Sequence, residues 1–387
     1  MQRIQAQERS DWRDKAEKLG FIFHTMYGEA YWDETAYYSF TLEQIETGIE
    51  DPTAELYAMC LDVVDRAVAS EELLTKLAIP ENMWGLIVDS WQKKAPSLYG
   101  RFDLCYDGKR PAKMLEFNAD TPTSLYESAY FQWLWLEDKI QDGTFGGKTD
   151  QFNSIQEKII DRFAELFEPG SNIHFASCKD TEEDRQTVKY LEDCAAQSGH
   201  TPHFVYVEDI GLDRFGRFAD TKDNVIQALF KLYPWEDMVR EEYAPHLPTC
   251  DVTFLEPAWK SVLSNKAFLP LIWQFNKGHP NLLPAAFEGD VDMDELGTGF
   301  VKKPIFSREG ANVSIFKDGE TLEEGEGEYG EEGFIYQSFE QLPLFEDNYT
   351  VIGSWLVGDE PAGMALREDK DLVTKDLSRF LPHIIVD

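Results

Sequence analysis

The feature that most restricts the fold of this chain is a short segment in which polar and apolar side chains alternate on both sides of an Asp-Gly pair. Arg101 and Asp103 precede Asp107-Gly108, and Glu116 and Asn118 follow it. Asp-Gly between two alternating stretches is typical of a β-hairpin, and residues two apart share one face of a strand. We therefore expect the four polar side chains to lie together on one face of a hairpin. The opposite face is expected to carry the apolar side chains of Leu104, Leu115 and Phe117.

This polar face can be interpreted in two ways. Two carboxylates and an amide oxygen are the hard oxygen ligands that Mg²⁺ prefers, usually together with substrate phosphates and water. A guanidinium beside them would suit a phosphate or a developing negative charge. The alternative is an ordinary amphipathic hairpin whose charged face pairs in solvent, and the spacing alone does not separate the two interpretations.

A longer motif favours the first interpretation. The segment reads R-x-D at residues 101–103 and E-x-N-A-D-[ST]-x-[ST] at residues 116–123. This pattern resembles the metal and nucleotide centre of the glutathionylspermidine synthetase family, whose members are ligases of the ATP-grasp type. The resemblance extends from near the N-terminus to the C-terminus, and it includes N-K-A-x-L-P at residues 265–270 and G-x-x-x-R-E-D at residues 363–369.

The resemblance implies a set of metal ligands and a nucleotide site. The residues that would hold the magnesium ions, two in number, are Asp103, Glu116 and Asn118. Arg101 would contact ATP and stabilise the transition state. Arg367 would be a second phosphate clamp, although an arginine at this position can equally pair with Glu368 at the surface. The residues implied to contact ATP are Arg101, Phe102, Asp103, Lys266, Lys303, Gly310, Gln337 and Leu372.

Three of these residues also allow a plainer explanation. Lys266 starts an apolar segment, where a lysine can neutralise phosphate but is commonly solvated. Gly310 lies in the loop 307–313, which is too short and too charged for a P-loop, but whose backbone N–H groups could approach phosphate as a flap. Gln337 would hydrogen-bond adenine from an expected strand that could equally be one more core strand.

Two further segments are candidates for binding the substrates. Thr121, Thr123 and Ser124 precede an expected helix, and hydroxyl groups at a helix start can bind an anion or simply cap the helix. The resemblance implies that this turn contacts glutathione. Ser124 stands where some members of the family have a cysteine, and the two threonines replace serines, which leaves the acid substrate open. Glu182 and Glu183 match a pair of glutamates beside the substrate site of the family, and capping of their own helix explains them equally well.

Charge and cysteine content restrict the partners and the compartment. The 387-residue chain has 72 acidic and 36 basic residues and a formal net charge of −36. Such a surface disfavours nucleic acid and anionic membranes and would attract a cationic amine, although it could also serve solubility alone. Five scattered cysteines without a C-x-x-C motif suit a reducing compartment, and neither a signal peptide nor a membrane span is evident. We therefore expect a cytoplasmic protein.

The expected architecture is an α/β, ATP-grasp-like ligase with a mainly helical N-terminal region. Residues 1–387 would form one glutathionylspermidine synthetase-like unit, with a helical support region (1–100), a metal and substrate lobe (101–270) and an ATP-grasp nucleotide lobe (271–387). A strand, a helix and a second strand in the middle lobe predict a βαβ unit with parallel strands. The amidase domain that bifunctional members of the family carry in front of the synthetase is not expected.

These expectations combine into one function. The chain would be an ATP- and magnesium-dependent acid–amine ligase that forms an amide through an acyl phosphate, joining a glutathione-like or peptide carboxylate to a polyamine-like amine. The alternative is an ATP-binding protein with only ATPase or regulatory activity, which the complete set of polar residues disfavours. The identities of the acid and the amine and the oligomeric state do not follow from the sequence.

Overall fold

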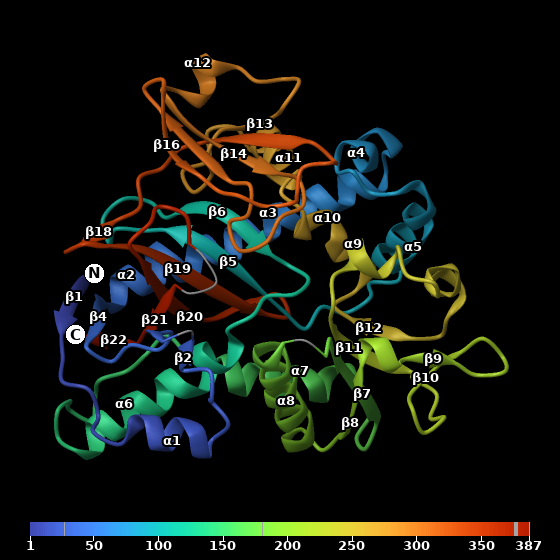
Figure 1. The fold of residues 1–387 in the computed structure, drawn as a ribbon, viewed down its shortest axis with the longest axis horizontal. Coiled ribbons are helices and arrows are strands. Elements are labelled where there is room, and N and C mark those ends of the chain that lie inside the picture. Colours follow the sequence, from blue (N-terminus) through green and yellow to red (C-terminus); the bar gives the residue numbers. More distant parts are fainter. Residues whose placement is uncertain (27, 180, 375–377, 387) are drawn as a thin grey trace.

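The computed structural model describes residues 1–26, 28–179, 181–374 and 378–386, and its largest sheet lies in the middle of the molecule (Figure 1). This central sheet is antiparallel, with the strand order β21-β20-β19-β5-β6. Its members are β5 (Tyr99–Cys105), β6 (Lys113–Asn118), β19 (Asn348–Val357), β20 (Glu360–Asp369) and β21 (Arg379–Leu381), and the short strand β18 (Leu344–Phe345) also pairs with β19. The expected hairpin and a C-terminal hairpin therefore share one sheet, and strand pairing crosses the lobe boundary expected at residue 270.

The register of β5 and β6 brings the predicted polar residues together. Arg101 pairs with Asn118 and Asp103 pairs with Glu116 across the two strands. The hairpin is thus confirmed, although its loop is longer than a two-residue turn because the strands end at Cys105 and resume at Lys113. One carboxylate oxygen of Asp107 closes this loop by accepting the backbone N–H groups of the two residues after Gly108, each at 2.9 Å.

One expectation for this hairpin is wrong, because a β-bulge changes the side to which Leu115 points. The register shifts between Asp103 and Leu104, so that Leu104 lies opposite Met114 and Leu115 is left without a cross-strand partner. A bulge inserts one residue into a strand and redirects the side chains beyond it. Met114 therefore takes the core position that was expected for Leu115, and Leu115 faces the pocket described below.

The N-terminal region is helical over much of its length but not at its start. Its main helices are α3 (Asp51–Val68), α4 (Glu71–Lys76) and α5 (Glu81–Gln92). Before them, β1 (Gln2–Gln5) and β4 (Ala36–Thr41) form a three-stranded sheet with β22 (His383–Val386). These strands depend on pairing with the far end of the chain, which a local sequence pattern does not reveal.

A second sheet carries the expected βαβ unit. Its strands are β7 (Asn172–Ser177), β8 (Thr201–Tyr206), β11 (Ala228–Leu232) and β12 (Thr253–Leu255), and all of them are parallel in the order β12-β11-β7-β8. The helix α8 (Glu182–Gln197) connects β7 to β8. The predicted parallel unit is therefore confirmed, and the acidic start of α8 follows the carboxyl end of β7.

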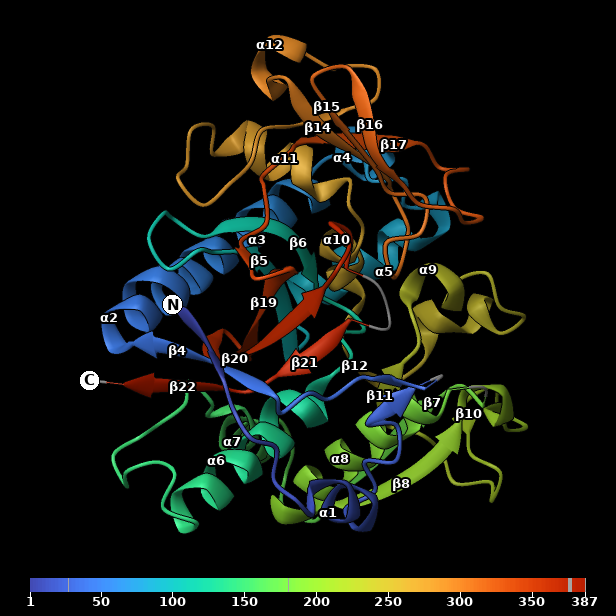
Figure 2. The same ribbon diagram turned by 60° about the vertical axis from the view of Figure 1, so that its left-hand side comes forward.

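A third sheet is antiparallel, with the order β13-β17-β14-β15-β16. Its strands are β13 (Ala285–Phe287), β14 (Gly299–Pro304), β15 (Ser314–Lys317), β16 (Glu320–Glu324) and β17 (Phe334–Ser338). Figure 1 and Figure 2 both show this sheet above the central sheet and the parallel sheet below it.

The central sheet is buried on both faces. Phe102 and Leu104 of β5 belong to a core cluster with residues of α3, whereas Tyr99 and Trp355 belong to a second cluster with residues of α7 (Ile155–Leu166). A sheet covered on both faces has little freedom to bend, so the polar side chains at its end are held on a rigid base. Within the described residues, no helix is both long and apolar enough to cross a membrane.

A buried carboxylate fastens the two ends of the chain to the central sheet. Glu368 on β20 is fully buried and accepts hydrogen bonds from Arg3 Nε at 2.6 Å and Arg379 Nη2 at 3.2 Å, and also from the Tyr38 hydroxyl. The pairing of Arg367 with Glu368, considered above as an alternative, is not what the structure shows. The two side chains point to opposite sides of β20, as neighbours on a strand do.

Replacing Glu368 by Gln should destabilise the fold. Removing one member of a buried ion pair leaves its partners uncompensated, which costs about 3–5 kcal/mol of unfolding free energy. The control is Glu346→Gln, because Glu346 also pairs with Arg3, at 3.1 Å, but its side chain is 59% exposed. The control variant should lose at most about 1 kcal/mol of unfolding free energy. Denaturant unfolding followed by tryptophan fluorescence measures the unfolding free energy of both variants. Equal losses in the two variants would contradict the role of Glu368 as a buried anchor of the fold.

Candidate active site

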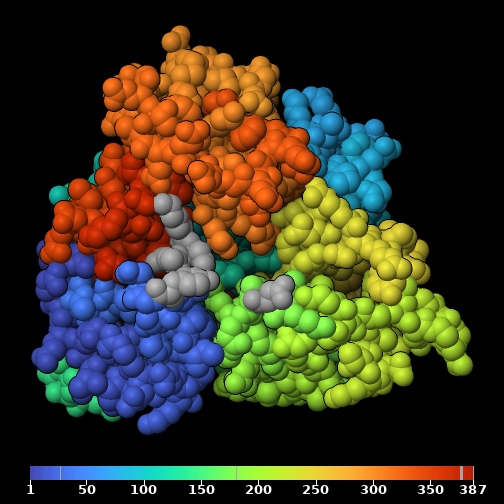
Figure 3. All heavy atoms as spheres, viewed as in Figure 1, coloured from blue at the N-terminus to red at the C-terminus, as the bar shows by residue number. Residues whose placement is uncertain are grey.

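A cavity of about 680 Å³ lies where the three sheets meet. Figure 3 shows the surface hollowed between the orange residues near 310 and green residues below them, and residues 181–184 at the start of α8 line the cavity. All but one of the residues implied to bind metal, ATP or substrate line this cavity. The exception is Phe102, whose side chain stacks on Phe117 with ring centroids 4.0 Å apart in the core beneath.

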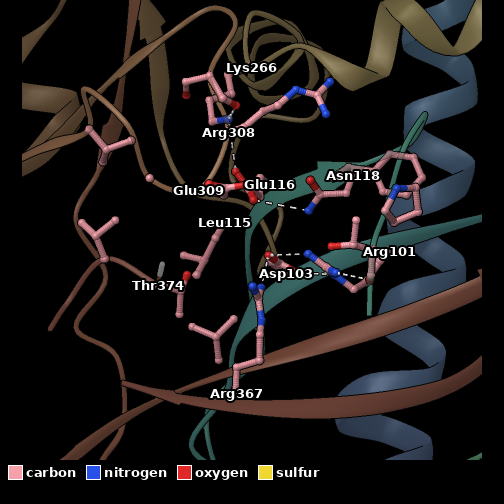
Figure 4. A pocket seen from close by; sticks show the side chains of 18 of the residues that line it. Arg101, Asp103, Leu115, Glu116, Asn118, Lys266, Arg308, Glu309, Arg367 and Thr374 are labelled. Carbon is pink, nitrogen blue, oxygen red and sulfur yellow. Dashed lines mark hydrogen bonds and ion pairs between the residues drawn. The ribbon is translucent and has the colours of Figure 1, made fainter. Parts of the chain in front are cut away.

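The base of the cavity is an ion-pair cluster between the two hairpins of the central sheet (Figure 4). Asp103 accepts a hydrogen bond from Arg101 Nε at 2.8 Å and another from Arg367 Nη2 at 2.5 Å. Arg101 and Asp103 are 7% and 3% exposed. Arg101 also donates to the carbonyl oxygen of Thr123 at 2.8 Å. Two guanidinium groups are thus fixed side by side at the floor of the cavity.

A second polar group lies beside this cluster on β6. Asn118 Nδ2 donates to Glu116 Oε1 at 3.3 Å, and Lys266 Nζ lies 3.4 Å from Glu116 Oε2. Burial alone would raise the pKa of Glu116, but Lys266, Lys303 and Arg101 outweigh it and lower the pKa to about 2. Glu116 therefore stays ionised at neutral pH, as a metal ligand must.

Lys303 and Gln337 connect the third sheet to this group. Lys303 Nζ donates to Gln337 Oε1 at 2.7 Å and to the carbonyl oxygen of Leu115 at 3.0 Å. Burial lowers the pKa of Lys303 to about 8, with a further lowering by Lys266, against the opposing effect of Glu116 and Asp103. The ammonium group is therefore close to its titration point near neutral pH and would gain from a phosphate partner.

The donor atoms fit magnesium. Two carboxylates and an amide oxygen are hard donors, and such sites are completed by substrate phosphates and water. Asp103, Glu116 and Asn118 lie next to one another through the register of β5 and β6. In the part of the chain that the structure describes, no group of three or more His, Cys, Asp or Glu side chains is placed to hold a metal ion. A magnesium ion held by these residues would take its remaining ligands from phosphate and water.

The loop 307–313 lies over the cavity and is fastened on two sides by an arginine that was not among the residues predicted from the sequence. Arg308 Nη1 donates to Thr121 Oγ1 at 3.1 Å, and Nη2 donates to Glu236 Oε1 at 3.0 Å. Its position two residues before Gly310, in a loop expected to cover phosphates, was the available signal. Gly310 itself approaches another loop, since a Cβ there would lie 2.4 Å from Val373 Cγ1.

The turn 120–124 is held in a strained conformation by buried partners. Ser124 has a φ of +70°, which a residue with a side chain seldom adopts. Beneath the turn, Asp120 pairs with Lys231 Nζ at 2.7 Å and accepts the backbone N–H of Trp235 at 2.9 Å. Asp120 stood in the recognised motif, but its buried partner on β11 could not be inferred from that motif.

One wall of the cavity is acidic. Glu182, Glu183 and Asp184 from the start of α8 and Glu236 from α9 (Trp235–Met238) all line it. Glu183 Oε1 accepts a hydrogen bond from the Tyr31 hydroxyl at 3.3 Å. Thr181 is the N-cap residue of α8 and its hydroxyl donates to Asp184 at 2.7 Å, and both glutamates lie in the first turn, where their charge also favours the helix dipole. The opposite end of the cavity is apolar and is lined by Leu115, Val301, Ile315, Leu342, Val351 and Leu372.

Comparison with known proteins shows the family to which this chain belongs. Residues 3–386 match the family described as glutathionylspermidine synthase preATP-grasp. The chain belongs to this family. A protein of Haemophilus influenzae named "Putative acid--amine ligase" is 41% identical over 382 residues, which cover 95% of each chain. The family expected from the sequence is thereby confirmed.

More distant relatives agree with this assignment. The bifunctional glutathionylspermidine synthetase/amidase of Escherichia coli is 27% identical over 97% of this chain, and the trypanothione synthetase of Crithidia fasciculata is 28% identical over 83%. This chain spans 63% and 52% of the lengths of those two proteins. A solved glutathione synthetase-like effector of Globodera pallida shares the fold, with a TM-score of 0.59 at 10% identity over 97% of this chain and 95% of its own. The expected α/β ATP-grasp-type fold is confirmed, and the chain is an ATP-dependent ligase that forms carbon–nitrogen bonds.

Gly353 on β19 makes room for Arg101, which provides a test of the ion-pair cluster. A Cβ at Gly353 would lie 2.9 Å from Arg101 Cδ, so that Gly353→Ala must displace this side chain. Because small misplacements of catalytic groups can cost up to about 100-fold in rate, we expect ligase turnover to fall by about 10- to 100-fold. The control is Gly211→Ala, where a Cβ would meet nothing within 4 Å. Equal turnover in the two variants would contradict the role of Arg101.

The lowered pKa of Lys303 predicts a pH dependence of ATP binding. The ammonium group is charged below about pH 8 and neutral above it. The dissociation constant for ATP should therefore increase as the pH rises, by roughly tenfold between about pH 7 and about pH 9. In Lys303→Arg the charge persists and this dependence should disappear. Calorimetric titrations with ATP measure the dissociation constant of both proteins at each pH. If Lys303→Arg keeps the pH dependence of the unmodified chain, a group other than Lys303 causes it.

Proposed function

We propose that the chain is a magnesium-dependent acid–amine ligase that activates a carboxylate as an acyl phosphate. The observation that carries this proposal is the convergence of cations and carboxylates at one point. Arg101 and Arg367 flank Asp103, and Lys266 and Lys303 act on Glu116, where the three sheets meet. Four cations exceed what two carboxylates need, so the arrangement suits a ligand that brings several negative charges, as the phosphates of ATP do.

In this proposal the nucleotide lies across the cavity between the central and the third sheet. The adenine occupies the apolar end near Leu115 and Leu372, with Gln337 at its edge. Lys303 and Lys266 would contact the phosphates, and Asp103, Glu116 and Asn118 would hold the magnesium ions. Those ions would neutralise phosphate charge when bound. The loop 307–313, fastened through Arg308, closes the cavity to water.

The chemistry proceeds in two balanced steps. A carboxylate oxygen of the acid attacks the γ-phosphorus of ATP, the bond to the β,γ-bridging oxygen breaks, and ADP leaves. The amine nitrogen then attacks the acyl carbon, the amide forms, and phosphate leaves while the nitrogen releases a proton. Arg101 and Arg367 stabilise the negative charge of the transferred phosphoryl group, which is the main requirement of this kind of transfer.

The walls of the cavity support a polyamine-like amine and a glutathione-like or peptide acid. Glu182, Glu183 and Asp184 present negative charge to the cavity, which a cationic amine would neutralise. The turn with Thr121, Thr123 and Ser124 lies beside Arg101 and would bind the acid. The names of the related synthetases, which refer to glutathionylspermidine and trypanothione, agree with this pair of substrate classes.

Removing the magnesium ligands should abolish ADP formation without unfolding the chain. We expect Glu116→Ala and Asn118→Ala to lower magnesium-dependent ADP release by at least about 100-fold, because positioning and charge neutralisation carry phosphoryl transfer. Asp107→Asn is the control, since Asp107 lies in the loop of the same hairpin but does not line the cavity. ADP release is measured with glutathione and spermidine present. Release at the rate of the unmodified chain in the two alanine variants would overturn the metal assignment, and release that does not depend on acid and amine would support a plain ATPase instead.

The acidic wall predicts a selective loss of amine affinity. In Glu183→Gln the KM for spermidine should rise about tenfold or more, because a hydrogen bond between charged groups is lost, whereas the KM for ATP should stay unchanged. Glu192→Gln, on the same helix but paired with Arg185 at 2.8 Å and outside the cavity, is the control. An equal change in the KM for spermidine in both variants would place the amine elsewhere.

A further inference from the structure

Glu127 is a buried carboxyl group that the proposed reaction has not used. It opens the π-helical turn Glu127–Phe131, three residues after Ser124, and is 1% exposed. Among the described residues, neither of its carboxylate oxygens has a hydrogen-bond partner of good geometry. Burial of a carboxyl group without such partners is strongly unfavourable, and exceptions of this kind in folded proteins call for a functional explanation.

Tyr31 stands between this carboxyl group and the cavity. Tyr31 lines the cavity, whereas Glu127 does not. The Tyr31 hydroxyl donates to Glu183 Oε1 at 3.3 Å and lies 3.5 Å from Ser124 Oγ. The same hydroxyl also interacts with the Glu127 carboxyl group. Glu183 on the acidic wall is therefore connected through one buried hydroxyl to a carboxyl group behind the wall.

The surroundings of Glu127 suit a group that gains and loses a proton near neutral pH. Burial raises the pKa of Glu127 to about 7, against the opposing effects of its own backbone N–H, the Tyr31 hydroxyl and the Arg101 guanidinium. Burial and the two carboxylates Glu127 and Glu183 raise the pKa of Tyr31, so this phenol stays neutral. Tyr126 is a further titratable group that interacts with Glu127. The strand β20 and the helix α7 also pack on this turn, and they contribute Ala365 and Ile155 to the same apolar cluster.

We infer that Glu127 is the final acceptor of the proton that the attacking amine releases, and that Tyr31 carries this proton from Glu183 to Glu127. The inference rests on the proposed function, in which the amine lies against Glu183. The ammonium group gives one proton to the Glu183 carboxylate, which frees the nitrogen lone pair for attack; the second proton, which the nitrogen releases as the amide forms, leaves on the departing phosphate. Protonated Glu183 then donates to the Tyr31 oxygen while the Tyr31 hydroxyl donates its own proton to ionised Glu127. Glu183 and Tyr31 end as they began, and Glu127 has gained the proton that the amine lost.

A spectroscopic titration tests the acceptor without substrates. The infrared band of a protonated carboxyl group should disappear as the pH rises through about 7, and Glu127→Gln should lack this change. Tyr31→Phe removes a group that lowers the pKa of Glu127, so the midpoint should move to higher pH. Glu192→Gln, which removes another partly buried carboxyl group with a raised pKa, should leave the band in place. Absence of any titration that depends on Glu127 between about pH 5 and about pH 9 would overturn the inference.

Two nucleophiles separate proton removal from activation of the acid. With glutathione and ATP, hydroxylamine is uncharged at neutral pH and needs no base, whereas spermidine must first lose a proton. In Glu127→Gln we expect formation of the spermidine amide to fall about 100-fold, which is the usual size of a general-base contribution, while hydroxamate formation stays within a factor of two to three. In the unmodified chain, amide formation should decrease as the pH falls through about 7. This acidic limb of the pH profile should be absent in Glu127→Gln, and Glu127→Asp should restore part of the amide formation.

The outcomes distinguish this inference from the proposed function. If the unmodified chain forms neither hydroxamate nor amide, the proposed function fails and the relay falls with it. If the unmodified chain forms both, and Glu127→Gln lowers both equally, Glu127 supports the fold of the turn and the inference is wrong. Selective loss of the amide, together with loss of the acidic limb of the pH profile, supports the relay.

Discussion

The ion pair of Asp103 with Arg101 and Arg367 is the interaction on which the site depends. It joins two hairpins whose contributing residues are 264 positions apart in the sequence. Burial makes an uncompensated charge costly, so each member requires the others, and the packed cores on both faces of the sheet keep the cluster from relaxing toward solvent. Gly353 leaves space for Arg101, and the buried carboxylate of Glu368 anchors β20, which carries Arg367. Fold and site are therefore stabilised by the same strands.

Charge balance explains why such a cluster suits a nucleotide. Lys266, Lys303 and Arg101 lower the pKa of Glu116, and burial leaves Lys303 with a weakened proton affinity. Binding of ATP with magnesium would restore the balance, since the phosphates pair with the cations and the metal pairs with the carboxylates. On the other side of the turn 120–124, the acidic wall carries negative charge and suits a cationic amine. The buried Glu127 behind this wall suits an amine that must lose a proton. In the function we propose, the turn would separate a region for phosphoryl transfer from a region for amine binding.

The sequence allowed the prediction of the features that follow from local patterns. Alternation around Asp107-Gly108 predicted the hairpin and its polar face, and the motif that begins at Glu116 led to the family. Features that depend on distant partners could not be predicted. The bulge that turns Leu115 into the cavity, the pairing of β1 and β4 with β22, and the ion pair beneath Asp120 each arise from strands far away in the chain. The side chain of Phe102 faces the core while its neighbours on the strand face the cavity, an orientation that the motif alone does not reveal.

In the function we propose, this cluster activates a carboxylate by direct transfer of phosphate to it. Labelling the carboxylate of glutathione with oxygen-18 tests this most directly, because an acyl phosphate carries one carboxylate oxygen into the released phosphate. We expect each phosphate formed together with the amide to contain one labelled oxygen, as read by mass spectrometry. Phosphate without label, formed at the same rate as the amide, would contradict it, because the γ-phosphate would then have been transferred to water.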